Sequence, residues 1–204
     1  TLRRGHEFSS AGWATYWDPD PSAREQMRTL ARRAGDRLRE EVDFRGTFTV
    51  DGVVTSDGFW PTELNPRFGA GIMTIARGTG IPMVLVNDLI VGGYDIGRTA
   101  LDLEADVVTH GDARRGGGTW QGGLDIETEL ESEPVQYLDG AWVWARSGGP
   151  IDGRVTAGSG FIRCLYDQAS TPIGPSTGPR AVAFWEFAAA EFGIDTAGLA
   201  AART

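Results

Sequence analysis

The hydrophobic pattern of this chain changes its period between residues 42 and 46. From Met27 to Val42 apolar residues recur three and four positions apart, which predicts an amphipathic helix. Asp18 to Ser22 provide capping side chains and a first-turn proline for that helix. From Gly46 to Asn65 the pattern alternates, with Ser56 to Gly58 as a turn, which predicts a β-hairpin. A helix followed directly by an antiparallel hairpin favours an α+β fold.

The length of the hairpin loop determines which side chains face each other. A three-residue loop pairs Asp51 with Glu63 and Thr49 with Asn65. Because side chains alternate along a strand, Glu63, Asn65 and Arg67 are expected on one face, with Asp51 directly across. A slip of one residue would place the two acids on opposite faces.

Two directly opposed carboxylates, at Asp51 and Glu63, repel each other unless a positive group lies between them. Mg²⁺ suits such a site, because it takes one or two carboxylates and completes its shell with water and phosphate oxygens. Asn65 would add a carbonyl oxygen. The alternative is a surface hairpin on which Arg67 pairs with Glu63. Pro61 lacks a backbone donor and requires an edge or bulge position.

Composition limits the possible partners. A net charge of −9 argues against a phosphate-neutralising surface, so no nucleic acid partner is expected. No apolar run approaches the roughly 20 residues of a spanning helix, so no membrane partner is expected either. A single cysteine, Cys164, excludes a disulfide framework and favours a cytoplasmic location, and we expect this thiol to be buried and structural. All 19 basic residues are arginine, which excludes a P-loop lysine.

The stretch from the predicted helix through Glu63-Leu64-Asn65-Pro66-Arg67 resembles the C-terminal half of an ATP-grasp catalytic domain. The helix, the strand that ends in Asp51, the separation of the two acids and the ExNPR string coincide, over roughly residues 13 to 100. The resemblance implies that Asp51, Glu63 and Asn65 bind Mg²⁺ on ATP. It also implies that Arg67 contacts the reacting phosphoryl or carboxylate group. Asp51 departs from the glutamate of many members, and its shorter reach leaves direct ligation open.

The resemblance implies an ADP-forming carboxylate-amine ligase with ATP and Mg²⁺ as cofactors. In such an enzyme a carboxylate attacks the γ-phosphorus to give an acyl phosphate and ADP, and an amine then displaces phosphate to form an amide. The Asn-Pro-Arg-Phe-Gly ending at residues 65–69 is similar to amino-acid and peptide ligases, including the type found in pheganomycin biosynthesis. Biotin-carboxylase-like and purine-pathway enzymes share the ExN motif, so the acid and the amine or peptide substrate stay undefined.

The N-terminal half of an ATP-grasp domain, with its ATP-gripping lysines and glycine-rich lid, has no counterpart in this lysine-free chain. The chain also begins at Thr1 rather than at a methionine. We therefore expect an upstream segment or a separate chain to supply that half, and the isolated fragment to be inactive. Arg4, in an N-terminal strand, is a candidate contact to the nucleotide phosphates; the alternative is a solvated strand end.

We expect two domains, separated near a glycine-rich stretch at residues 114–118 that is typical of a flexible loop or linker. Residues 1–112 would form the ATP-grasp C-terminal half, an antiparallel sheet with packed helices. Residues 113–204 would form a small β-rich appendage with a terminal helix. Two other hypotheses stay open: a noncatalytic ATP-grasp-derived nucleotide-binding or interaction module, and an unrelated β-rich binding domain with an accidental hairpin match.

Overall fold

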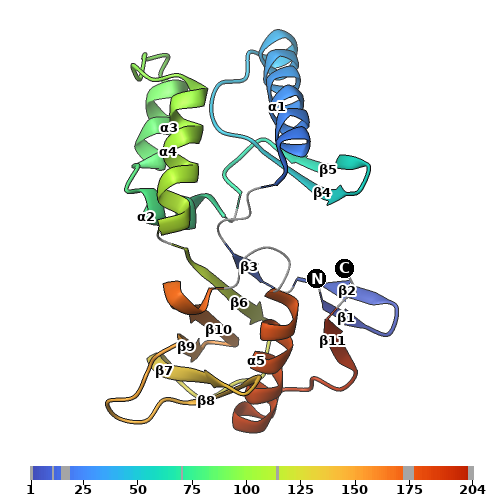
Figure 1. The fold of residues 1–204 in the computed structure, drawn as a ribbon, viewed down its shortest axis with the longest axis vertical. Helices are drawn as coiled ribbons and strands as arrows, with labels where there is room; N and C mark the ends of the chain where they lie inside the picture. Colours follow the sequence, from blue (N-terminus) through green and yellow to red (C-terminus); the bar gives the residue numbers. More distant parts are fainter. Residues whose placement is uncertain are drawn as a thin grey trace. The chain divides into compact units, whose positions relative to one another are not determined.

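The computed structural model describes residues 2–10, 12–14, 19–69, 71–113, 115–171 and 177–201. The fold is α+β, and the strands described pair antiparallel throughout (Figure 1). The chain forms two compact units. Unit 1 comprises Thr1–Tyr16 and Asp112–Thr204, and unit 2 comprises Trp17–Gly111.

This division differs from the expected domains 1–112 and 113–204 at the N-terminus. Strand β1 (Leu2–Arg4) pairs with β11 (Leu199–Ala201), and β3 (Trp13–Ala14) pairs with β6 (Gly117–Gly122). Leu2 is also buried in the core of unit 1, with 2% of its surface exposed. The N-terminal strands therefore belong with residues 112–204, because their backbone partners and their apolar contacts lie there.

The main sheet of unit 1 has six strands in the order β3-β6-β10-β9-β7-β8. A smaller sheet has the order β11-β1-β2. The remaining strands of unit 1 are β2 (Glu7–Ser9), β7 (Leu130–Leu138), β8 (Ala141–Trp144), β9 (Gly153–Gly158) and β10 (Phe161–Tyr166), with a short helix η1 (Gln168–Ser170) after β10. The expected β-rich region with a terminal helix is thus confirmed in outline.

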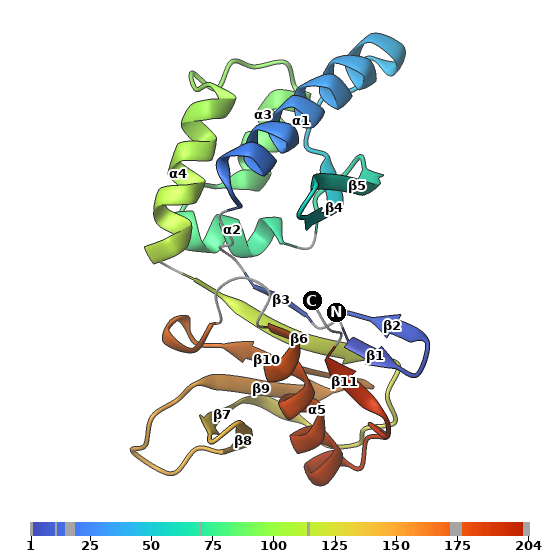
Figure 2. The same ribbon diagram turned by 45° about the vertical axis from the view of Figure 1, so that its right-hand side comes forward.

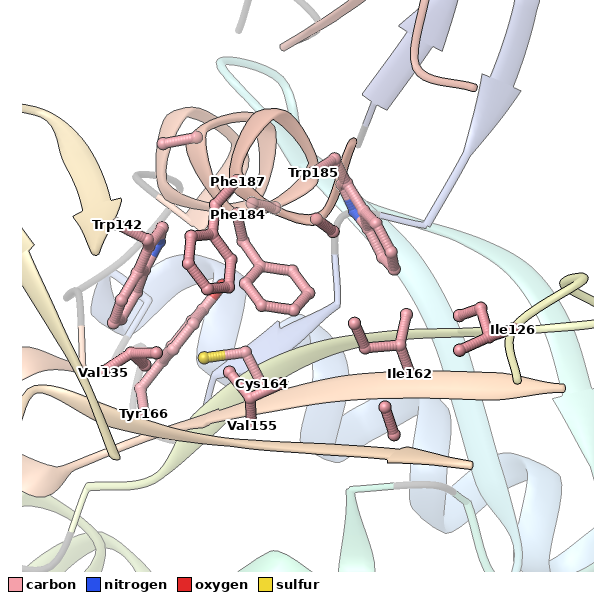
Figure 3. Packing of buried hydrophobic residues seen from close by; sticks show 14 of the residues in the cluster. Ile126, Val135, Trp142, Val155, Ile162, Cys164, Tyr166, Phe184, Trp185 and Phe187 are labelled. Carbon is pink, nitrogen blue, oxygen red and sulfur yellow. The ribbon is translucent and has the colours of Figure 1, made fainter. Parts of the chain in front are cut away.

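Helix α5 (Thr177–Phe192) packs against one face of the six-stranded sheet and forms the core of unit 1 (Figure 3). Phe184 of the helix and Ile162 and Val155 of the sheet are fully buried between them. The Trp142 indole donates to the Arg180 carbonyl at 3.1 Å, which fixes one end of the helix to the sheet. Burial raises the pKa of the Cys164 thiol, so this cysteine is a buried structural thiol, as expected.

The glycine-rich stretch at residues 114–118 is not a flexible linker in its described part. Gly117 and Gly118 are buried in β6. A Cβ on Gly118 would lie 2.5 Å from the Cys164 carbonyl oxygen, and one on Gly117 would lie 3.0 Å from the Trp13 carbonyl oxygen. Glycine is required here because neighbouring strands approach closely, a use of glycine that composition does not distinguish from flexibility. Arg114 lies outside the described residues.

Unit 2 combines a hairpin with four helices in its described part. Its elements are α1 (Pro21–Val42), β4 (Thr49–Thr55), β5 (Gly58–Asn65), α2 (Ile72–Thr79), α3 (Met83–Val91) and α4 (Ala100–Ala113), the last of which ends just beyond the unit boundary. The Asp20 carboxylate caps α1 by accepting from the backbone amides of Ser22 at 2.9 Å and Ala23 at 3.1 Å. This confirms the predicted helix start.

Polar contacts connect the elements of unit 2. Arg28 of α1 donates to both carboxylate oxygens of Glu104 of α4, with its shortest contact at 2.8 Å. The Gln26 side chain of α1 accepts from the Phe59 amide of β5 at 2.8 Å, and α1 lies beside the hairpin (Figure 2). The Asn87 side chain of α3 accepts a hydrogen bond at 2.8 Å from the backbone amide of Thr47, two residues before β4. Side-chain to backbone bonds thus align the hairpin with two helices.

Unit 2 buries little apolar surface. Among its residues whose burial the structure describes, Ala23 is the only one that is buried. Large apolar side chains of this unit are exposed on α1, on the hairpin, on the later helices and in the loop after α3: Val42, Val53, Trp60, Leu64, Val84, Leu85, Val91, Tyr94 and Leu101. Within the described part of the chain, no helix is both long enough and apolar enough to cross a lipid bilayer.

Candidate functional site

The hairpin of β4 and β5 has the predicted register at its base. Asp51 pairs with Glu63, and Thr49 pairs with Asn65. Because directly opposed residues of an antiparallel pair project from the same face, the two acids and Asn65 share one face of the hairpin. The Asn65 amide nitrogen donates to Asp51 Oδ2 at 3.0 Å across the strands, as expected for diagonal neighbours. The predicted pairing of the two acids is confirmed.

The turn reaches this register by a different route from the one expected. Thr55 pairs with Gly58, so the loop contains two residues rather than three. A bulge in β5 also leaves Thr62 unpaired, opposite the step from Asp51 to Gly52 on β4. The shorter loop and the bulge each shift the pairing by one residue, in opposite directions, so they cancel at the acids. Pro61 lies beside the bulge, where its missing amide hydrogen costs no ladder bond.

The bulge also changes which residues accompany the acids. Beyond it, Val53 pairs with Trp60, and Gly52 pairs with Pro61. Since Val53 follows Asp51 by two positions, Val53 and Trp60 project from the acid face. The two side chains are 54% and 59% exposed. An unbulged strand would have placed Trp60 on the other face, so the sequence pattern alone did not associate it with the site.

Arg67 follows directly after β5, and backbone contacts hold its segment against the hairpin. Its amide donates to the Asn65 carbonyl at 2.8 Å, and its own carbonyl accepts from the Thr49 hydroxyl at 3.2 Å. The Arg67 guanidinium donates to the Phe68 carbonyl at 3.1 Å. These contacts hold the backbone of Arg67 beside Thr49 of β4.

The alternative interpretation, a surface ion pair between Arg67 and Glu63, is not formed in the described part of the chain. None of the ion pairs found there includes Asp51, Glu63 or Arg67. Both acids are exposed, and Asp51 accepts only the neutral amide of Asn65. Among the described residues, the hairpin therefore presents two negative charges that no ion pair compensates.

This donor set fits a divalent ion that brings ligands of its own. Two carboxylates and the carbonyl of Asn65 are hard oxygen ligands of the kind that Mg²⁺ binds. In the described residues, no cluster of three or more histidine, cysteine, aspartate or glutamate side chains could bind a metal ion. The hairpin matches the pattern of Mg²⁺ sites that use one or two carboxylates together with water and substrate phosphates.

Arg4 belongs to the other compact unit. It belongs to β1 of unit 1, whereas the hairpin belongs to unit 2. Its guanidinium donates to the Asp195 carbonyl at 2.8 Å and lies 3.6 Å from the Asp195 carboxylate. These contacts explain its position within unit 1.

A pocket of about 480 Å³ lies between α1 and β5, within unit 2. Phe59 and Pro61 line it from the strand, and Leu30 and Arg33 line it from the helix. Phe59 and Pro61 pair with Val54 and Gly52, so they belong to the hairpin face opposite the acids. This pocket is therefore separate from the acid face.

Comparison with known proteins returned no relative. No protein-family model, curated protein or solved structure matches this chain. The function is accordingly proposed below from the residues of the hairpin and their chemistry.

Proposed function

We propose that this chain provides the metal and phosphate site of an ATP- and magnesium-dependent carboxylate-amine ligase of the ATP-grasp type. The observation that supports this proposal most strongly is the hairpin register, in which Asp51 faces Glu63 and Asn65 lies on the same face. Like charges directly across a ladder destabilise a hairpin, so a counter-ion is the simplest explanation for an uncompensated pair.

Asp51, Glu63 and Asn65 are the residues that would bind the ion together with the phosphate oxygens of ATP. Bound Mg²⁺ would neutralise charge on those oxygens as the phosphoryl group moves. The role of the hairpin is to hold three oxygen ligands on one rigid face. Two hydrogen bonds maintain that arrangement, one from the Asn65 side-chain amide to Asp51 and one from the Thr49 hydroxyl to the Arg67 carbonyl.

Arg67 is the proposed anion stabiliser. A substrate carboxylate would attack the γ-phosphorus and release ADP, and an amine would then displace phosphate from the acyl phosphate to form an amide. Negative charge accumulates on the oxygens of the transferred group during the first step, and a planar guanidinium pairs well with such oxygens. Because Arg67 has no acid partner among the described residues, its charge is available for that group.

The proposal includes a second portion of the enzyme, supplied by an upstream segment or a separate chain. Two observations support this. Unit 2 buries almost none of its described apolar side chains, and a two-stranded sheet is marginally stable without further strands or packing. The chain also contains no lysine to contact ATP. A partner that covers the exposed apolar surface and supplies those lysines would answer both needs.

Binding of Mn²⁺ together with ATP, measured on this chain combined with its missing portion, tests the site. Paramagnetic Mn²⁺ should broaden the amide resonances of Asp51, Glu63 and Asn65 selectively. The Glu63→Gln variant should lose this broadening, whereas Asp57→Asn, which removes a charge from the turn of the same hairpin, should retain it. The same loss in both variants, or no broadening at the hairpin, would contradict the proposal.

Turnover separates a ligase from a noncatalytic nucleotide-binding or interaction module. ADP release by the chain together with its missing portion, with candidate acids and amines supplied, should depend on Glu63 and Arg67. Nucleotide binding at the hairpin without any ADP release across a broad set of acids would favour the noncatalytic module.

A further inference from the structure

The six-stranded sheet of unit 1 has one face covered by α5 and a second face that bears aromatic side chains. Along β6, Thr119 is buried on the side of α5, and Trp120 projects to the second face with 59% of its surface exposed. Gly118 and Gly122 flank Trp120 on that face. A Cβ on Gly122 would lie 3.7 Å from the Trp120 ring. Because glycines flank it, Trp120 has no large neighbour on its own strand.

A pocket of about 200 Å³ adjoins this tryptophan. Residues of β3, β6 and β10 line it: Trp13, Thr119, Trp120, Phe161, Arg163 and Leu165. Trp13 reaches the pocket because β3 pairs with β6 at Gly118. The N-terminal strand thus supplies one wall of a pocket whose other walls come from residues more than a hundred positions later.

Arg163 is the charged group of this pocket. It lies opposite Trp120 on one neighbouring strand and opposite Thr156 on the other. Its guanidinium carbon is 5.8 Å from the centre of the Phe161 ring, within the range of a cation–π contact.

Several other arginines of this acidic chain are neutralised by close acids. Arg28, Arg37 and Arg98 each form an ion pair with an Asp or Glu at 2.8 Å or less. In the part of the chain that the structure describes, Arg163 forms no such pair, although its side chain is exposed. A guanidinium with free donors among aromatic rings is suited to bidentate recognition of a carboxylate.

We propose that this pocket binds a small molecule with a flat apolar body and one carboxylate group. The carboxylate pairs with Arg163, and the apolar body contacts Trp13 and Trp120. The volume is below the roughly 300–1,000 Å³ of sites for drug-sized ligands, so the ligand is about the size of an aromatic amino acid. The site lies in unit 1 and requires neither nucleotide nor metal, so it goes beyond the proposed ligase reaction and does not depend on it.

Ligand-detected NMR titration of the whole chain tests this site with three probes. We would use 3-phenylpropionate, the neutral 3-phenylpropanamide, and acetate, which lacks the apolar body. The acid should bind saturably, and the amide should bind at least about tenfold more weakly, because a hydrogen bond to a charged group contributes roughly 1.5–3 kcal/mol. Acetate should show no saturable binding.

Two arginine variants localise the binding. Arg163→Gln should weaken binding of 3-phenylpropionate by about tenfold or more. Arg154→Gln is the matched control, since Arg154 lies on β9 beside Leu165, donates to the Ser132 carbonyl and does not line the pocket. This control should leave the affinity within about twofold of the unmodified chain.

Each other outcome overturns the proposal. Equal binding of acid and amide would show an apolar site without carboxylate recognition, and equal effects of the two arginine variants would place the anion elsewhere. Absence of saturable binding in the unmodified chain would show that the pocket does not recognise an aromatic carboxylate. Thermal unfolding of each variant identifies any variant that fails to fold. If Arg163→Gln does not fold, Arg163→Lys replaces it; lysine keeps the charge but lacks the two parallel N–H donors of the guanidinium, so this variant should also weaken binding.

Discussion

Replacing Glu63 by glutamine should stabilise the metal-free protein. In the proposed site, Glu63 and Asp51 face each other without a counter-ion, so removing one charge relieves a repulsion. In a surface hairpin held by an ion pair between Glu63 and Arg67, the same change would remove an attraction. The sign of the stability change therefore distinguishes the two interpretations without any assumption about the substrate.

The magnitude follows from the register and the exposure of the two acids. Directly opposed side chains are about 5 Å apart, and two unit charges at that distance repel by roughly 0.8 kcal/mol in the dielectric of water. Both carboxylates are exposed, so the dielectric of water is the appropriate limit. The hydrogen bond from Asn65 to Asp51 offsets part of the repulsion. We expect Glu63→Gln to raise the free energy of unfolding by about 0.5 kcal/mol at low salt.

The assay is urea unfolding of the metal-free chain at neutral pH, with chelator present. The gain from Glu63→Gln should shrink at about 1 M salt, where the screening length is only about 3 Å. Asp57→Asn serves as the control, because it removes one charge from the same hairpin without a facing carboxylate. Adding Mg²⁺ with ATP should reverse the order, so that the unmodified chain becomes the more stable one.

A loss of stability on Glu63→Gln at low salt would refute the reasoning. It would mean that Glu63 has an attractive partner in solution, as the surface ion pair requires. An equal gain from Asp57→Asn would show that the effect reflects net charge rather than the facing pair.

Two further predictions concern the two units. Phe184→Ala should destabilise unit 1 by about 3–5 kcal/mol in urea unfolding, because it truncates a fully buried ring. The control Glu186→Ala replaces an exposed residue of the same helix and should change the free energy of unfolding by no more than about 0.5 kcal/mol. Equal effects of the two substitutions would contradict the described core. The hydrogen bond from Arg28 lowers the pKa of Glu104. The ion pair should therefore stabilise the protein at pH values above the ordinary glutamate pKa, and this stabilisation should be lost as the pH falls through the lowered pKa of Glu104. Glu104→Gln should flatten the dependence of the free energy of unfolding on acidic pH, and the same dependence in variant and unmodified chain would contradict this.

Local features of the fold were predictable because they depend on neighbouring residues. The start of α1 follows from the Asp20 cap and the first-turn proline. The pairing of Asp51 with Glu63 was predicted as well, but from an incorrect loop. The two-residue loop and the bulge at Thr62 compensate each other, and the alternation of the sequence shows neither of them.

Contacts between distant segments were not predictable in the same way. The pairing of β1 with β11 and of β3 with β6 joins segments that are far apart in the sequence, and no periodicity of a short strand specifies such a partner. The position of Arg4 beside Asp195 follows from that pairing. The pocket around Arg163 depends on it too, because Trp13 becomes a wall only when β3 joins β6. The glycines of β6 could have been a signal for close strand packing, but they also match a linker.

The pairing of β3 and β11 with distant segments makes unit 1 a discontinuous domain that residues 17–111 interrupt. During synthesis β1 cannot pair with β11, and β3 cannot pair with β6, until all of residues 17–111 have been made. Pairing between distant strands slows folding, because the chain loses conformational entropy on closing the long loop before the strand contacts stabilise it. A truncated protein that begins at residue 113 would lack β1 and β3 and would leave β6 and β11 with bare edges, a recognised cause of aggregation. Dissection of this protein should therefore keep both terminal segments together.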